Sequence, residues 1–240
     1  MRGVSDKSIR LQAEHPSTMN AILENFFNWP IYLQVAPFLL RGLAMTVGLS
    51  ILVIPVGFLA GLVIAILSQH LRSRVARFFL AAYIDLFRAI PPLVLLIFIY
   101  FGAPFLGMDP PKLLAVSIGF MLNNSSYYGE VLRAGFESVP RGQIEAARST
   151  GLNALQTTLL VVVPQAIRNV MPELISNTIE VIKLTTIASV VALPELLRVA
   201  RDAQSLLYNP SPVMLAALVY LAMLWPLVRL LRRFEKVHAR

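Results

Sequence analysis

One stretch without a single charged side chain constrains the fold of this chain more than any other feature. It runs from Gly42 to Gln69, and a helix needs only about 20 apolar residues to cross the roughly 30 Å hydrocarbon core of a bilayer. Four further apolar runs follow, so we expect an all-α integral membrane protein with about five transmembrane helices. These runs are Ala89–Met108, whose helix is expected to begin near Arg77, Leu113–Leu132, Leu174–Leu193 and Pro212–Val228.

The composition favours burial in lipid over a soluble fold. Hydrophobic residues make up 57% of the 240 residues and charged residues 14%, whereas soluble domains average about 45–50% and about 25%. The net charge of +8 would suggest nucleic-acid binding in a soluble protein. Here the basic residues lie between and after the apolar runs, as in membrane proteins, so lipid and not nucleic acid is the expected partner.

The distribution of arginine and lysine predicts the orientation. These residues concentrate in the first and third connections and after the last run, which places those segments on the cytoplasmic side. Five spans then put the N-terminus outside and the tail, residues 236–240, in the cytoplasm. Residues 1–37 lack the pattern of a cleaved signal peptide and are expected to be extracytoplasmic, while residues 38–235 form the membrane domain. Four residues oppose this orientation: Arg2, Lys7, Arg10 and Arg41.

Aromatic residues gather in the segment from Met19 to Leu40. Phe26, Phe27, Trp29 and Tyr32 have rings of the kind that favour the membrane interface. An interfacial helix and a loosely ordered lead-in with an aromatic anchor both explain this pattern.

The third connection predicts two short helices. The first is expected over Ser138–Thr150, with Ser138 as N-cap and Pro140 in the first turn. Gly151 follows, where helices commonly end in a left-handed residue.

A second helix is expected from Ala154 to Val163. Asn153 suits its N-cap, and Gln156 completes a capping box. Pro164 lacks a backbone donor and is expected to end the helix and turn the chain. Residues 138–164, called the elbow below, would then form a rigid bent pair, suited to act as a lever or as an ordinary re-entry helix pair.

The elbow resembles the EAA motif of ABC-importer permeases. That motif has glutamate and two alanines, then a glycine, then an apolar stretch ending in proline. Val161–Val163 stands where the family usually carries isoleucine-x-leucine. The matching residues are Glu145, Ala146, Ala147, Gly151 and Pro164.

Other segments resemble the polar amino acid uptake permeases of this family, of the histidine, glutamine and arginine type. They extend the resemblance over roughly residues 38–235, which implies the type I ABC importer transmembrane fold. The segments are Asp85–Pro92, Tyr127–Gly135, Ser138–Gln143 and Arg41–Leu43 with Thr46.

The resemblance implies a permease subunit in the bacterial cytoplasmic (inner) membrane that translocates an amino acid or a similar small polar solute. Two permease subunits, identical or related, would form the pathway, and an extracytoplasmic solute-binding protein would deliver the solute. Separate ATPase subunits would contact the EAA residues and use ATP and Mg²⁺. The chain itself has no phosphate-binding loop ending in Gly-Lys-Ser/Thr, so we expect no bound cofactor and no catalysis.

Polar residues within the third and fourth runs are candidates for the solute pathway, because such groups in hydrocarbon need a partner or a wet cavity. Interhelical packing is the alternative for the first four, and an ion pair with Lys183 for Glu180. Relatives often carry aspartate where this chain has Leu184, which leaves the solute open. The candidates are Asn123, Ser126, Tyr127, Glu130, Asn177, Glu180 and Thr185.

Two other classes of protein are compatible with apolar runs. A secondary, ion-coupled carrier usually shows internal repeats, and none is visible. A membrane enzyme would need a nucleophile or metal cluster. The chain has no cysteine, and His15, His70 and His238 are scattered, so no catalytic or metal site is expected.

Overall fold

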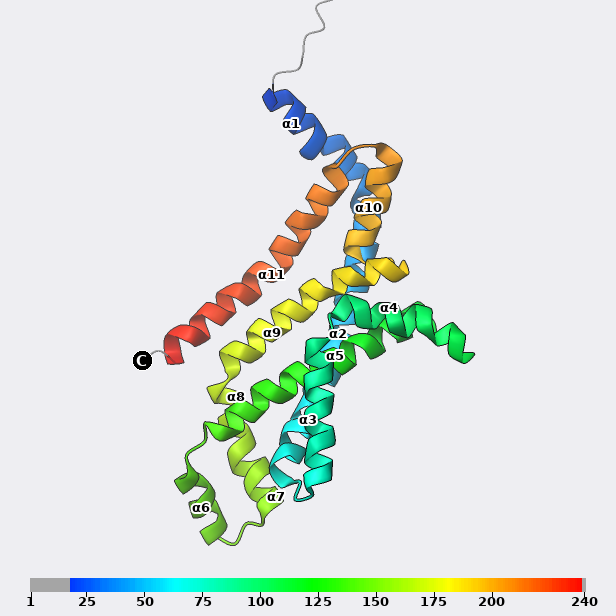
Figure 1. Ribbon diagram of the computed structural model, residues 1–240. Helices are drawn as coiled ribbons and strands as arrows, with labels where there is room; N and C mark the ends of the chain where they lie inside the picture. The colour runs from blue at the N-terminus through cyan, green and yellow to red at the C-terminus, as the bar shows by residue number, and fades with distance from the viewer. Residues whose placement is uncertain (1–17, 239–240) are drawn as a thin grey trace, which may run out of the picture.

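The computed structural model describes residues 18–238, and every regular element in that range is a helix (Figure 1). Three short elements depart from α geometry: η1 (Ala103–Leu106) and η3 (Thr185–Val191) are 3₁₀-helices, and η2 (Thr158–Val162) is a π-helix. The α-helices are α1 (Thr18–Phe26), α2 (Trp29–His70), α3 (Arg74–Ala89), α4 (Pro92–Gly102), α5 (Lys112–Glu137), α6 (Arg141–Ser149), α7 (Ala154–Thr157), α8 (Val163–Asn169), α9 (Met171–Leu184), α10 (Leu196–Leu207) and α11 (Ser211–His238).

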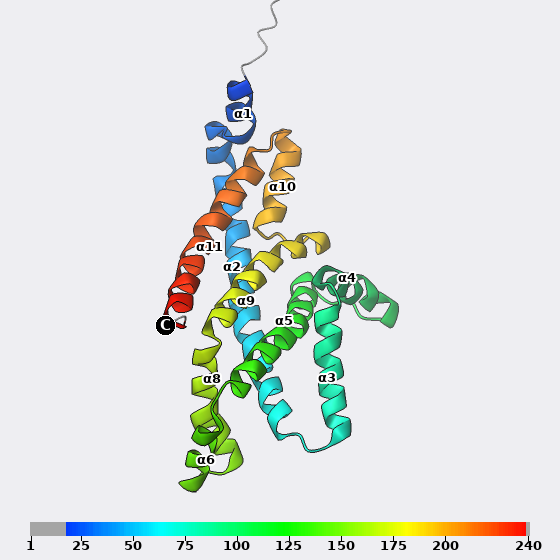
Figure 2. The ribbon, with the colours of Figure 1, turned by 60° about the vertical axis from the view of Figure 1, so that its left-hand side comes forward.

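Helix α5 lies at the centre of the molecule, with its longest contact along α2 (Figures 1 and 2). Glycines allow the two backbones to approach. A Cβ added to Gly61 would lie 2.6 Å from the Tyr128 Cβ and 2.8 Å from the Gly129 nitrogen, and one added to Gly129 would lie 2.9 Å from Ile64 Cγ2. Glycines at positions 57 and 61 therefore serve packing within this chain.

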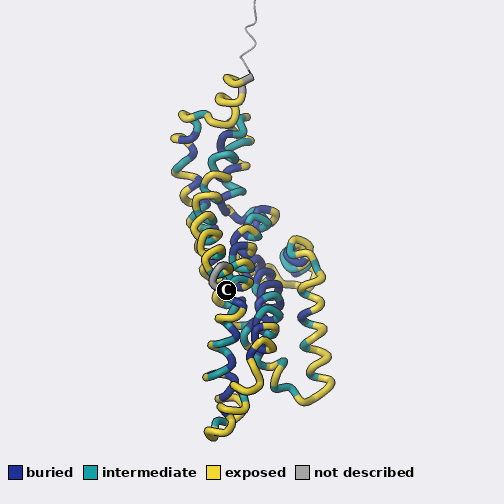
Figure 3. Tube along the Cα trace, turned by 90° about the vertical axis from the view of Figure 1, so that its left-hand side faces the viewer, coloured by how far each residue is buried: buried dark blue, intermediate teal, exposed yellow. Residues whose placement is uncertain are grey.

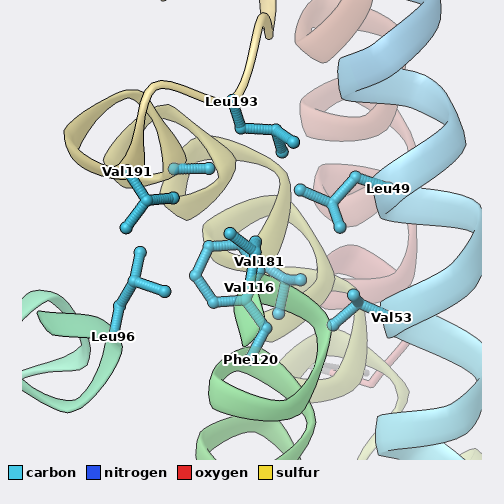
Figure 4. Close-up of a cluster of buried hydrophobic side chains, with 9 residues drawn as sticks. Leu49, Val53, Leu96, Val116, Phe120, Val181, Val191 and Leu193 are labelled. Atoms are coloured by element: carbon cyan, nitrogen blue, oxygen red, sulfur yellow. The ribbon is translucent and has the colours of Figure 1, made fainter. Parts of the chain in front are cut away.

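Three apolar clusters surround this helix pair, and burial is concentrated in the middle of the molecule (Figure 3). The first joins α2, α4, α5, α9 and η3 (Figure 4), and includes Leu49, Leu96, Phe120 and Val181. The second joins α2 and α5 to the elbow and α8. The third packs α2 against α10 and α11.

By length and apolar composition, three helical stretches of the described chain can cross a membrane: Ile22–His70, Met171–Val191 and Ser211–Glu235. A fourth is added if α3 and α4 with η1 count as one bent span. Helix α5 falls outside this set although it has 26 residues. Its second half is polar, and much of that half is buried against other helices instead of facing lipid.

The second expected span differs from the prediction of one helix starting near Arg77. Helices α3 and α4 meet at a bend of 99°. A residue before proline is pushed out of the helical region, and Ile90 and Pro91 are extended, with ψ of 126° and 132°. The Asn123 side chain on α5 donates to the Phe87 carbonyl at 2.8 Å, which supports the end of α3.

The expected boundary between residues 37 and 38 falls inside a helix. Helix α2 begins at Trp29, behind the N-cap Asn28, whose side chain accepts from the Ile31 nitrogen at 3.2 Å. The aromatic segment is therefore split between α1 and the first turns of α2 and is not one flat interfacial helix. Likewise, α11 continues to His238 across the expected boundary at residue 235. Residues 1–17 and 239–240 lie outside the described range.

We expect Gly61→Ala to destabilise the protein by about 1–3 kcal/mol, the usual effect of overpacking, because the new methyl group meets the α5 backbone. Gly48→Ala is the matched control on the same helix, since nothing lies within 4 Å of a Cβ there. Thermal unfolding in detergent should show a lower midpoint for the first variant only. Equal midpoints would contradict this account of the α2–α5 contact.

Candidate functional site

The entry to the elbow differs from the sequence prediction. Ser138 is not the N-cap of α6; it ends α5, where its hydroxyl donates to the Gly135 carbonyl at 2.7 Å. Pro140 occupies the N-cap position without a side-chain bond. Asn169, at the end of α8, donates from Nδ2 to the Ser138 hydroxyl oxygen at 2.8 Å. The two ends of the elbow region are therefore tied to each other.

The corner between the two elbow helices agrees with the prediction. Gly151 has φ of +90°, a left-handed conformation that strains other residues. Asn153 accepts from the Gln156 nitrogen, and the Gln156 side chain accepts from the Asn153 nitrogen, both at 2.9 Å. The glycine turn and the capping box are thus confirmed.

Pro164 does not end the second helix, as the sequence suggested. The helix widens into the π turn η2, in which the Val163 nitrogen donates to the Thr158 carbonyl, and then continues as α8 to Asn169. The Gln165 side chain donates to the Val161 carbonyl at 2.9 Å. A π turn and a side-chain donor thus accommodate the proline inside the helix, and the chain turns only at Val170.

The elbow extends beyond the helix bundle at the end of the molecule opposite α1 (Figures 1 and 2). Glu145 and Ala146 are exposed, whereas Ala147 is buried. Glu145 takes part in none of the ion pairs found among the described residues. Gly151 and Pro164 are also exposed. The elbow thus presents a carboxylate and small residues outward.

Three of the seven pathway candidates are buried and donate to nearby carbonyls. Asn123 bonds the Phe87 carbonyl, as described above, and Ser126 donates to the Asn123 carbonyl at 2.6 Å. Thr185 is fully buried and donates to the Ile182 carbonyl at 2.7 Å. These three side chains have structural partners.

Tyr127 and Glu130 lie on the side of α5 that faces α3. The Arg88 guanidinium stands 5.5 Å above the Tyr127 ring. Arg133 donates two hydrogen bonds to the Glu130 carboxylate, at 2.6 and 3.0 Å, and one to Glu137 at 2.5 Å. A cleft of about 240 Å³ opens beside Glu130 and Arg133, between α3 and α5.

The remaining candidates lie on α9. Glu180 forms the predicted ion pair with Lys183, and their side chains are 58% and 48% exposed. The Nδ2 atom of Asn177 is buried with no hydrogen-bond partner in the part of the chain that is described. The fold therefore distributes the seven candidates over α5, α9 and the first residue of η3.

Glu195 is a structural residue that sequence reasoning missed. It is fully buried and N-caps α10, accepting from the Leu197 and Arg198 nitrogens at 2.8 and 2.7 Å and from the Tyr220 hydroxyl at 3.1 Å. An acidic residue directly before an amphipathic helix is the sequence pattern that predicts this N-cap. This carboxylate links α10 to α11.

A comparison with known protein families identifies the family of this chain. The family described as "Binding-protein-dependent transport system inner membrane component" matches residues 54–237. The chain belongs to this family. It is thus a multi-pass, non-catalytic membrane subunit of a transport system, a permease, and the family implies ATPase and binding-protein partners.

Individual relatives agree with this assignment. The permease is 34% identical over 178 residues to the probable amino-acid ABC transporter permease protein YckA of Bacillus subtilis, covering 74% of this chain and 78% of the relative. It is 33% identical over 202 residues to the probable glutamine ABC transporter permease protein GlnP of the same organism, covering 82% and 92%.

Solved structures share the fold. The crystal structure of an amino acid ABC transporter with histidines matches with a TM-score of 0.76 and 34% identity, covering 85% of this permease and 95% of that chain. An inward-facing structure of the MetNI methionine ABC transporter matches with a TM-score of 0.71, covering 86% and 99%. At 18% identity, the second match bears on the fold alone.

We expect Glu195→Ala to lower the stability of the permease by about 1–3 kcal/mol or more, because each buried donor left unpaired is destabilising by that order. Asp202→Asn on the same helix removes only an exposed ion pair with Arg198 and should cost about 0–1 kcal/mol. Thermal unfolding in detergent measures both variants, and equal midpoints would refute the linking role of Glu195.

Proposed function

We propose that this chain is the permease subunit of an ATP-driven importer that carries an amino acid or a similar small polar solute inward. The support is the outward-facing elbow with exposed Glu145 and Ala146, together with relatives named as amino-acid and glutamine ABC transporter permeases.

The elbow is suited to receive force from a separate ATPase. Gly151 and the Asn153 capping box hold its corner, so the two short helices keep one mutual orientation. ATP-bound and ATP-free partners that contact Glu145, Ala146 and Ala147 differently would shift the permease between its inward and outward forms. ATP and Mg²⁺ belong to the partner in this scheme.

The exposed ion pair on α9 supports a second permease subunit. Glu180 and Lys183 are exposed within the candidate span Met171–Val191, and charges in hydrocarbon are unfavourable unless they face a partner or a wet cavity. A second copy or a related permease would enclose this surface as a pathway. Tyr127, Glu130, Asn177 and Glu180 are then the candidates for solute contact, since the other three are buried.

The orientation follows from the basic residues near the elbow. The end of the molecule that holds the elbow also holds the connection between α2 and α3 (Figure 1). Lys and Arg favour the cytoplasmic side, so the elbow faces the ATPase there, and the opposite end receives an extracytoplasmic solute-binding protein. The basic residues at this end include Arg72, Arg74, Arg77, Arg141 and Arg148.

Reconstitution with its ATPase and binding protein tests the proposal. Uptake into proteoliposomes should require ATP hydrolysis and should stop when the ATPase is inactivated by mutation. Uptake that continues without hydrolysis, driven by an ion gradient, would identify a secondary carrier instead.

Gly151→Val should uncouple ATP hydrolysis from uptake without loss of membrane insertion, because valine resists φ of +90° and the corner must deform. Gly107→Val is the matched control: Gly107 also has positive φ, at +75°, with nothing within 4 Å of an added Cβ, but it follows η1 away from the elbow. A comparable loss of coupling in both variants would argue against the lever.

Glu180→Gln should raise the KM of uptake about two- to tenfold, the weight of one ordinary hydrogen bond, because water screens the charge at an exposed site. Glu173→Gln, exposed in the first turn of α9, should leave the KM unchanged. Wild-type kinetics for Glu180→Gln would assign this residue to the ion pair alone.

A further inference from the structure

The elbow contacts the membrane helices through apolar packing and through side-chain hydrogen bonds. Ile144 on α6 packs against the apolar cluster that includes Phe136 and Val162. Asn169 at the end of α8 donates to Ser138 at the start of the elbow, as described above. This apolar cluster already includes Ala65 of α2. A hydrogen bond adds a second contact with α2: His70 Nε2, in the last residue of that helix, lies 3.1 Å from the Thr158 hydroxyl oxygen, in the first residue of the π turn.

The direction of this hydrogen bond follows from a second hydrogen bond that the Thr158 hydroxyl makes. The Thr158 hydroxyl donates to the Ala154 carbonyl at 3.0 Å and has one hydrogen, so it can only accept from His70. His70 Nε2 is therefore the donor. Thr158 is 8% exposed, and a cleft of about 240 Å³ lined by His70, Thr158 and Arg148 opens beside the bond.

The π turn and the close helix packing determine how a displacement of this bond reaches the transmembrane helices. One extra residue in a turn rotates the preceding residues by about 100° relative to the following helix, and η2 thereby sets the angle of Thr158 relative to α8. On the other side, α2 is held against α5 at Gly61 and Gly129. A displacement that reaches His70 therefore acts on the α2–α5 pair.

We propose that His70 is a positioning residue for energy coupling, whose bond to Thr158 makes the elbow and the end of α2 move as one body. This inference rests on the proposed function. Motion imposed on the elbow then enters the transmembrane helices through three routes: the covalent ends at residues 138 and 164, the apolar cluster shared with α2 and α5, and the bond to His70.

Thr158→Val tests the bond, because it keeps the side-chain shape and removes the hydroxyl. In proteoliposomes holding the complete transporter, we expect the ATP hydrolysed per solute imported to rise about two- to tenfold, the weight of one hydrogen bond. Thr158→Ser should keep the wild-type ratio. Thr157→Val is the matched control: it loses a similar bond, to the Asn153 carbonyl at 2.9 Å, but none to α2. A wild-type ratio in Thr158→Val would overturn the proposal.

A crosslink tests whether the elbow and the end of α2 move together. This test does not depend on whether the Thr158→Val variant folds. The chain has no cysteine, so His70→Cys with Thr158→Cys can be joined by a short bifunctional thiosulfonate. The joined transporter should import with the ATP-per-solute ratio of the wild type, and at a higher rate than the unjoined double variant. Crosslinking that blocks uptake would overturn the proposal. Absence of ATP-dependent uptake in the unsubstituted complex would instead defeat the proposed function.

Discussion

The close approach of α2 and α5 is the contact on which the rest of the structure depends. In lipid, helices gain little from the hydrophobic effect when they associate, so van der Waals packing and hydrogen bonds must hold them. Gly61 and Gly129 bring the two backbones together, and Tyr128 then reaches α9, where its hydroxyl bonds Thr178 at 2.8 Å. With α5 enclosed in this way, its second half can be polar without facing lipid.

Most polar groups in the bundle have a structural use. Asn123 and Ser126 bond carbonyls of α3 and α5, and Glu195 connects α10 to α11. Polar groups in a low-dielectric environment need such hydrogen-bond partners, because burying them unpaired is unfavourable. The exposed Glu180–Lys183 pair is an exception, because its charged groups can still contact another subunit, water or solute.

The elbow combines a stiff corner with attachments to several helices. Its corner is held by local features, the left-handed Gly151 and the Asn153 capping box. Its connection to the membrane helices instead uses side chains from distant parts of the chain, such as Asn169 on Ser138 and His70 on Thr158. A part built in this way is suited to transmit motion as a unit.

The sequence by itself determined the features that depend on neighbouring residues. The apolar runs indicated a helical membrane protein, and Gly151, Asn153 and Gln156 predicted the corner of the elbow, because glycine turns and capping boxes form within one or two helical turns. The EAA residues likewise identified the family before any fold was known.

Tertiary structure decided what depends on contacts between distant segments. The sharp break before Pro92 is supported by Asn123, the helix passes Pro164 through a π turn, and α2 begins as early as Trp29, where it packs with α10 and α11. The burial of Glu195 and the bond from His70 to Thr158 also belong here. Glu195 has local capping partners, but Tyr220 lies 25 positions away in the chain, and His70 and Thr158 are 88 positions apart. No local pattern specifies contacts between such distant positions, so only the packed helices bring these atoms together.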